Sequence, residues 1–301
     1  METIVECVPN FSEGRRPEIV KEIVEAMRAE GAVVLDEEMD ADHHRAVVSL
    51  AGEPKGIAKA AFAGVAAAAK RIDLREHKGA HPRMGACDVL PFVPVRGATT
   101  ELCVRLAEEV GERIGDELSI PVFLYGDAAK RPERADLAAV RKGQFEGLSE
   151  AIGRDPERQP DFGPAKIHAS AGATAVGARF FLIAYNVNLE SDDVDLAKRI
   201  AKKVRERDGG LPRVKALGFA LADRGIVQVS MNLTDFRVTS ILVAFEAVER
   251  EARAAGVEVR ESEIVGLVPR DSVFEGIEGR LRLNGFERSR QVVEDRLGLP
   301  A

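Results

Sequence analysis

The stretch FFLIAYNVN, residues 180–188, decides the fold because it resembles an earlier stretch, IVECVPN at residues 4–10. Both are short runs rich in β-branched or aromatic residues, which favour strands, and both end at an asparagine. Each is followed by the same series of hydrophobic patterns. The sequence is therefore expected to contain one structural unit twice.

The first copy alternates between the two hydrophobic periods that distinguish helices from strands. After the opening strand we expect a helix at 17–31, strands at 32–40 and 45–52, a helix at 54–72 and a strand at 87–95. Pro54 suits the first turn of its helix, where a missing N–H costs nothing. Further elements are expected in this half, namely a helix at 99–115, a strand at 121–126 and a helix at 135–143.

The second copy has the same order, β-α-β-β-α-β, which is the split βαβ pattern. Its strand at 180–188 is followed by a helix at 195–207, strands at 214–222 and 226–233, a helix at 238–256 and a strand at 263–269. We therefore predict an α+β protein of two tandem βαββαβ, ferredoxin-like subdomains at 1–178 and 179–301. Each is expected to have an antiparallel sheet with helices on one face, and a ligand cleft is expected between the two.

Composition excludes several classes of partner. The 301 residues carry a net charge of −7, whereas nucleic-acid binding needs a basic surface. The three cysteines form no CxxC pair, and the N-terminus has no basic, signal-like segment, so a reducing cytoplasm is expected. The most apolar helix candidate has only ten uncharged residues in a row, between Lys59 and Lys70, which is half of a membrane span, so no membrane partner is expected.

The segment HKGAHPRMG, residues 77–85, concentrates groups that bind anions or carry protons. Gly79 and Pro82 oppose a helix, so a His77–His81 metal pair is the weaker interpretation. A loop with these residues could instead bind an anion through Lys78 and Arg83, with His81 as a proton carrier near neutral pH. We expect this second role.

Three more segments carry polar groups with two possible roles. In DEEMDADHHR (36–45), acids and histidines follow a strand and form either a charged turn or part of a site. Asn10 and Ser12 are expected to cap the first helix or to bind a ligand. The basic residues of 125–148 are expected to form a solvated helix face; they are Lys130, Arg131, Arg134, Arg141 and Lys142.

The segment PDFGPAKIHASAGATAVGAR, residues 160–179, has little periodicity and joins the two copies. It is either a flexible linker or a binding loop. Its Lys166, His168, Ser170 and Arg179 favour a binding loop, since ligand sites are common at domain junctions.

Together these segments resemble the formiminotransferase family, the transferase half of formimidoyltransferase-cyclodeaminases. The matching segments span nearly the whole chain in order. They are VECVPNFSEG (5–14), HKGAHPRMGACDVLPFVPVRG (77–97), PVFLYGDAA (121–129), DFGPAKIHASAGATAVGARFFLIAYNVNL (161–189), VQVSMNLTDF (227–236) and EIVGLVP (263–269). One departure is His44, which stands where the family pattern D-x-DHNR has asparagine.

The resemblance implies transfer of a formimidoyl group from N-formimidoyl-L-glutamate to N5 of tetrahydrofolate, the co-substrate, in histidine breakdown and one-carbon metabolism. It implies that His81 is the catalytic residue. For this chemistry, Asp40 or Asp42 could stabilise the cationic amidinium or orient the imidazole, and the residues do not separate the two acids. No metal is expected. The resemblance also implies a homodimer, with a separate cyclodeaminase as pathway partner. The implied folate-binding residues are Gly163, Pro164, Ala165, Lys166, Ile167, His168, Ala169, Ser170, Ala171 and Gly172. Further candidate binding residues are Asn10, Ser12, Arg45, Lys78, Arg83, Tyr125 and Arg179.

The chemistry suits these residue types. Both substrates are anionic, so an acidic protein must concentrate positive charge at the site, for which Lys78, Arg83, Arg96, Lys166 and Arg179 are candidates. N5 loses a proton on attack and the departing amine gains one, and a single imidazole can do both.

Three alternatives stay open at this point. The donor could carry a formyl group instead, since O and NH differ little in shape. The paired units could form a non-catalytic module that binds a small ligand. The histidines His43, His44, His77 and His81 could hold a metal ion in a hydrolase.

Overall fold

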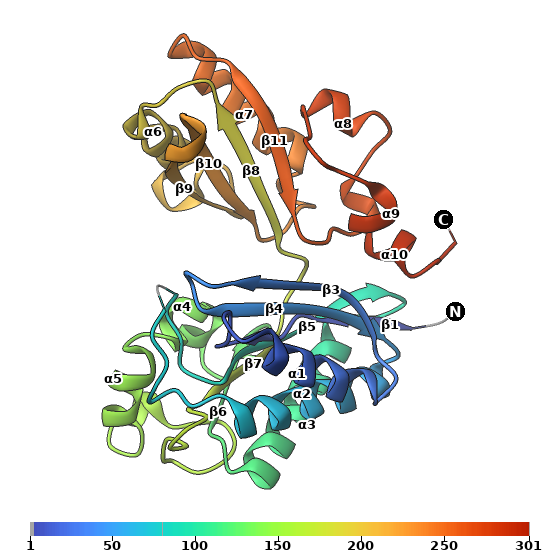
Figure 1. Cartoon of the computed structure of the whole chain (residues 1–301), viewed down its shortest axis with the longest axis vertical. Helices are drawn as coiled ribbons and strands as arrows, with labels where there is room; N and C mark the ends of the chain where they lie inside the picture. Colours follow the sequence, from blue (N-terminus) through green and yellow to red (C-terminus); the bar gives the residue numbers. More distant parts are fainter. Residues whose placement is uncertain (1–2, 80, 301) are drawn as a thin grey trace. The chain divides into compact units, whose positions relative to one another are not determined.

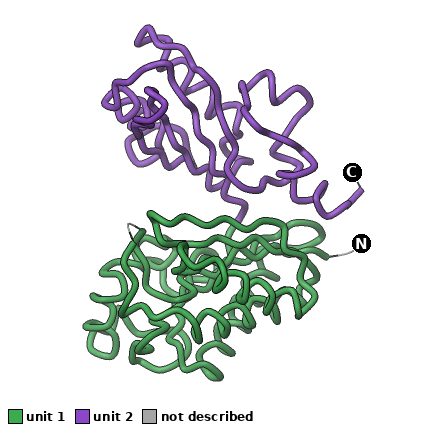
Figure 2. Tube along the Cα trace, viewed as in Figure 1, with its two compact units in different colours: residues 1–179 green, residues 180–301 purple. Residues whose placement is uncertain are grey.

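The computed structural model describes residues 3–79 and 81–300. The chain divides into two compact units, residues 1–179 and 180–301 (Figure 2). Each unit contains one β-sheet with helices, as the α+β class requires (Figure 1). Within the described residues, no helix combines the length and the apolar character that a membrane span needs.

Unit 1 begins with the predicted β-α-β-β-α-β order, with one change. The expected strand at 4–10 is split at Val8 and Pro9, and proline has no N–H for a sheet ladder. The elements are β1 (Ile4–Cys7), β2 (Asn10–Phe11), α1 (Pro17–Arg28), β3 (Val33–Asp40), β4 (Arg45–Gly52), α2 (Pro54–Arg71) and β5 (Cys87–Arg96). They are followed by α3 (Thr100–Leu118), β6 (Val122–Gly126), α4 (Leu137–Val140), α5 (Gln144–Ala151) and β7 (Thr174–Ala178).

The three long helices of unit 1 form one layer. Figure 1 shows α1, α2 and α3 side by side on one face of the sheet. The apolar stripe of α1, which includes Ile19, Ile23 and Met27, is buried there, as its spacing predicts. Gly64 of α2 lets α1 approach, because a Cβ at that position would lie 2.7 Å from the sulfur of Met27.

The sheet of unit 1 has seven strands in the order β1-β4-β2-β5-β7-β6, with β3 paired to β4. It differs from the predicted antiparallel sheet because β7 runs parallel to both β5 and β6. Strand β7 lies inside the segment 160–179, which was expected to be irregular. Its sequence, TAVGA, is made of small residues, and all five are buried. A larger residue at Gly177 would collide with the backbone of Tyr125, 2.4 Å from the added Cβ.

Helices lie on both faces of the sheet in unit 1 beside β5, β6 and β7, whereas one covered face was expected. The α1–α3 side buries Leu90, Leu124 and Val176. Their strand neighbours point the opposite way and pack with residues of α4 and α5 in a second, smaller core. That core contains Met84, Val89, Phe123, Tyr125, Val140, Leu148, Ile152, Ala173 and Ala175. The additional helices therefore lie beside the strands that carry the candidate site.

Unit 2 confirms the second β-α-β-β-α-β series. Its elements are β8 (Ile183–Leu189), α6 (Val194–Val204), β9 (Val214–Leu221), β10 (Ile226–Leu233), α7 (Ile241–Ala254) and β11 (Val259–Val265). The sheet is antiparallel throughout, in the order β11-β8-β10-β9. Ser240 caps α7 by accepting the N–H of Val243, so the helix starts three residues after the predicted start at 238. Short helices not predicted from the sequence complete the unit: α8 (Ile277–Arg280), α9 (Arg288–Gln291) and α10 (Val293–Arg296).

Candidate active site

His81 lies in the loop that joins α2 to β5, called the His81 loop below, and its side chain is half-buried. Its Nδ1 is 2.8 Å from Nη1 of Arg45 and 2.7 Å from the carbonyl oxygen of Pro82. Arginine only donates and a carbonyl only accepts, so the two contacts belong to different tautomers of the ring. When Nδ1–H donates to Pro82, the lone pair is on Nε2 and that nitrogen is a base.

The surroundings of His81 keep its ring neutral. Burial, together with the positive charges of Arg45 and Arg141, lowers the pKa of His81 to about 4. Burial also lowers the pKa of Arg45, to about 10, so this guanidinium still carries its charge at neutral pH. His81 is therefore a neutral imidazole at neutral pH and can accept a proton.

A buried carboxylate gathers the two arginines. Asp88 in β5 is fully buried, and its Oδ2 accepts hydrogen bonds from Arg45 at 3.1 Å and from Arg141 at 2.5 Å. Its Oδ1 accepts the N–H of Met84 at 2.8 Å. Arg45 also donates to the amide oxygen of Asn10, which places Asn10 behind Arg45. These contacts hold both arginines beside the His81 loop.

Asp88 was not among the residues predicted for the site, and Arg141, which was expected on a solvated helix face, instead pairs with it and has a side chain that is only 14% exposed. Asp88 is an acid within the apolar strand CDVLPFVPV, and a buried acid needs cationic or N–H partners. That signal was available in the sequence, although it names no partner. Arg134, from the same basic segment, is also buried and pairs with Asp161 at 2.7 Å.

Asp40 reaches His81 only through His43. The Asp40 carboxylate accepts the backbone N–H of His43 and contacts its Nδ1, each at 2.8 Å, and these hydrogen bonds lower the pKa of Asp40. The ring of His43 then lies edge-on to the ring of His81, with 6.3 Å between centroids. Asp42, the other predicted carboxylate, is exposed, as Asp40 is. What distinguishes Asp40 is its contact with His43, whose ring lies beside that of His81.

The cationic residues of the loop have separate environments. Arg83 is buried and donates to both carboxylate oxygens of Glu146, at 2.8 and 2.7 Å, and to Nδ1 of His77 at 3.2 Å. The other nitrogen of His77 lies 2.9 Å from the backbone oxygen of His44, to which it donates. These bonds use the guanidinium of Arg83 to hold the loop. Lys78 is exposed.

His44 takes a backbone conformation that explains the family pattern at this position. Its φ is 53°, in the left-handed region where asparagine and histidine are enriched among non-glycine residues. The ring of His44 packs edge-on to that of His77, with centroids 4.3 Å apart. The histidine at position 44 therefore belongs to the loop support.

Asn10 and Ser12 do not cap the first helix, because α1 begins only at Pro17. Glu13 accepts the N–H groups of Arg15 and Arg16 instead, at 2.9 and 3.0 Å. Ser12 donates its hydroxyl to the carbonyl of Gly85 at 2.7 Å. Ser12 thus secures the end of the His81 loop.

The segment 163–172 belongs wholly to unit 1, so it does not form the connection between the units. Its first part, residues 163–166, is exposed. Its end is joined to the His81 loop, since Ala86 donates to Ala171 and Ala173 donates to Met84, each at 2.9 Å. The N–H of Leu74 donates to the carbonyl of Ser170 at 2.8 Å. The predicted folate segment and the predicted catalytic loop are therefore adjacent.

Tyr125 is the next-to-last residue of β6, and Arg179 is the last residue of unit 1. Tyr125 is buried, and burial raises its pKa to about 12. Arg179 donates its backbone N–H to the carbonyl of Phe92 at 3.1 Å. The phenol of Tyr125 is thus neutral and inside the smaller core at physiological pH.

Four of the five histidines are arranged as two pairs, His43 with His81 and His44 with His77. Across residues 3–79 and 81–300, no group of three or more His, Cys, Asp or Glu side chains is placed to hold a metal ion. The geometry of these pairs suits proton transfer and loop support.

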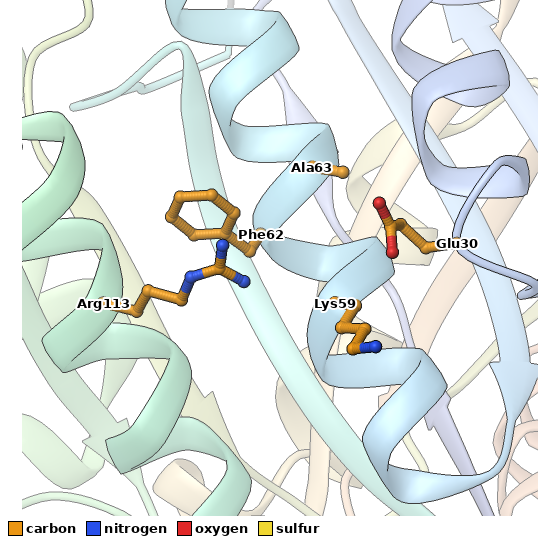
Figure 3. Close-up of a pocket in the computed structure, with 5 residues that line it drawn as sticks. All are labelled: Glu30, Lys59, Phe62, Ala63 and Arg113. Carbon is orange, nitrogen blue, oxygen red and sulfur yellow. The ribbon is translucent and has the colours of Figure 1, made fainter.

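A separate pocket of about 290 Å³ lies on the helical layer of unit 1 (Figure 3). Arg113 of α3 lies over the ring of Phe62 of α2, 3.7 Å from its centroid, and Glu30, Lys59 and Ala63 complete the lining. The residues that line this pocket include no histidine. We therefore place the candidate active site at His81 and not in this pocket.

Family models match both units. The model described as the N-terminal subdomain of the formiminotransferase domain matches residues 4–179. The model described as the formiminotransferase domain matches residues 184–284. Together these matches cover most of the chain in the order of the two units.

Named relatives match over nearly the full chain. A glutamate formimidoyltransferase from Thermoplasma acidophilum is 50% identical, over 95% of this chain and 94% of its own. One from Streptococcus pyogenes serotype M1 is 46% identical, over 99% of both chains. The formimidoyltransferase-cyclodeaminase of Sus scrofa is 42% identical over 99% of this chain, which spans 57% of that relative. The chain therefore belongs to the formiminotransferase domain family.

Proposed function

We propose that this protein is a glutamate formimidoyltransferase, which moves the formimidoyl group of N-formimidoyl-L-glutamate to N5 of tetrahydrofolate. The products are 5-formimidoyltetrahydrofolate and L-glutamate, a step of histidine degradation and one-carbon metabolism. The observation that carries the proposal is the neutral, half-buried imidazole of His81 beside Arg45, in a chain of this family. Two relatives of that name, matched over nearly their full length, support it.

The proposed reaction is an addition followed by an elimination at the amidine carbon. N5 attacks this carbon and becomes positively charged, and Nε2 of His81 accepts the proton that N5 then releases. The resulting imidazolium returns a proton to the glutamate nitrogen as the bond between that nitrogen and the amidine carbon breaks. One imidazole thus serves first as base and then as acid, a role worth ~10²–10⁴-fold in rate.

Asp40 is proposed to assist through His43, because its carboxylate fixes that ring, which faces His81. A negative charge at this place also favours the cationic amidine of the donor. Both carboxylates are exposed, so the contact of Asp40 with His43 is what favours Asp40 over Asp42 for this role.

Folate is proposed to bind along residues 163–172, whose exposed first part includes Lys166 and whose end adjoins the His81 loop. Exposed Lys78 is proposed to attract the anionic substrates. Ser12 and Arg83 are proposed to contribute by holding the loop, and Asn10 by holding Arg45. Tyr125, which is buried in the smaller core, and Arg179 are also proposed to contribute to binding.

The cellular setting follows from the same proposal. We expect a cytoplasmic homodimer that needs no metal and releases its product to a separate cyclodeaminase. The relative from Sus scrofa is named as a formimidoyltransferase and a cyclodeaminase in one chain, and this chain matches 57% of its length. Sedimentation equilibrium of the purified protein tests the dimer directly.

The test of the proposed reaction is an assay with two donors. Purified protein is incubated with tetrahydrofolate and either N-formimidoyl-L-glutamate or N-formyl-L-glutamate, while folate absorbance and glutamate release are followed. We expect equal molar formation of 5-formimidoyltetrahydrofolate and glutamate with the first donor. Turnover only with the formyl donor, or binding without turnover, would overturn the proposed function.

A further inference from the structure

We infer that Arg141, together with Arg45, binds the α-carboxylate of the formimidoyl donor, an inference that rests on the proposed function. Arg141 follows the short helix α4, and its side chain is 14% exposed. Its Nη2 donates to Asp88, the same carboxylate oxygen that accepts from Arg45. Two guanidinium groups from different parts of the sequence therefore meet at one point next to His81.

The charges of this cluster favour an additional anion. Two guanidinium groups share one buried carboxylate, and the third partner, Asn10, is neutral. Among the residues that the structure describes, Nε of Arg141 is buried without a hydrogen-bond partner. A buried cationic donor is unfavourable until an acceptor reaches it. An incoming carboxylate would supply both the negative charge and the acceptor.

Bond counting identifies which carboxylate fits. His81 must come within ~2.6–3.2 Å of the nitrogen that it protonates, and Arg45 is already 2.8 Å from that ring. The α-carboxylate carbon of the donor is two bonds from the leaving nitrogen, whereas the γ-carboxylate carbon is four bonds away. The carboxylates of folate are separated from N5 by an aromatic spacer. Of these carboxylates, only the α-carboxylate is held near the reacting nitrogen by a short chain of covalent bonds.

The experiment combines changes in the protein with changes in the donor. Arg141→Gln is compared with the unsubstituted enzyme on three donors: N-formimidoyl-L-glutamate, N-formimidoylglycine and the N-formimidoyl derivative of 4-aminobutyrate. The glycine donor keeps only the α-carboxylate, and the 4-aminobutyrate donor keeps only the carboxylate that corresponds to the γ position. If Arg141 binds the α-carboxylate, a donor that lacks this carboxylate has nothing for Arg141 to bind. The Arg141→Gln change should then have little effect on kcat/KM for that donor.

We expect Arg141→Gln to lower kcat/KM by about 10- to 100-fold on the glutamate and glycine donors, the range for a lost charge-assisted hydrogen bond. On the 4-aminobutyrate donor the loss is expected to be small. An equal loss on all three donors, or a loss confined to the 4-aminobutyrate donor, would overturn the inference. If the unsubstituted enzyme does not turn over N-formimidoyl-L-glutamate, the proposed function itself is contradicted, and the inference with it.

Two further variants make the test specific. Lys142→Gln makes the same change of charge at the adjacent, exposed residue and is expected to leave all three rates unchanged. Arg141→Lys keeps a positive charge near Asp88 but not the forked geometry, so it serves if Arg141→Gln fails to fold. It must show the same selective loss on the two donors with an α-carboxylate, and an unselective loss would overturn the inference. Thermal melting of each variant verifies the fold.

Discussion

At the scale of single residues, the proposed reaction depends on a neutral imidazole beside two guanidinium groups. Burial disfavours a charged ring at His81, and a proton there would also add positive charge beside Arg45 and Arg141. In the proposed reaction, a bound substrate carboxylate would offset part of that positive charge and raise the pKa of His81. The ring could then hold the proton that N5 is proposed to release.

The first prediction concerns this pKa in the unliganded protein. His81 is expected to titrate at about 4, well below the ordinary value of ~6.5. Arg141→Gln removes one of the charges that lower the pKa, so the ring should titrate at higher pH in that variant. NMR titration of ¹⁵N-labelled histidines measures both values, with Lys142→Gln as the matched control. This account of the ring would be contradicted if His81 titrated at the ordinary pKa, or if its pKa were the same in Arg141→Gln as in the original protein.

At the scale of structural elements, the His81 loop is fixed by its junction with the segment before β7. Gly85 pairs with Gly172 as an isolated bridge, and neighbouring residues exchange backbone hydrogen bonds across this junction. A Cβ at Gly85 would lie 1.9 Å from the carbonyl oxygen of Ala173, a contact that no side chain can make. The glycine is therefore required by close backbone approach.

Gly85→Ala is expected to lower the free energy of unfolding by ~1–3 kcal/mol, the usual range for overpacking. It should also slow transfer, because it shifts the loop that carries His81. Gly147→Ala in α5 is the control, since its added Cβ meets nothing within 4 Å. That change should stabilise the protein by ~0.5–1 kcal/mol, because alanine is the better helix former. Urea denaturation measures both, and a Gly85→Ala protein as stable as the original would contradict the close approach.

At the scale of the whole molecule, the repeated order of elements was predictable because periodicity marks helices and strands along both units. Strand β7 was not, since TAVGA consists of small residues without an alternating pattern, and its burial depends on neighbours distant in sequence. His81 and Arg45 could be proposed from motifs. Asp88 and Arg141 could not be paired, because 53 residues separate them and only the folded sheet brings them together.

The central claim is that the His81 imidazole transfers the proton in formimidoyl transfer, and the His81→Ala variant tests it most directly. Turnover with tetrahydrofolate and N-formimidoyl-L-glutamate is measured beside folate affinity and the melting temperature. We predict that kcat falls by ~10²–10⁴-fold, while folate affinity and melting temperature stay close to those of the unsubstituted protein. A variant that binds folate, melts normally and turns over at the original rate would contradict the account.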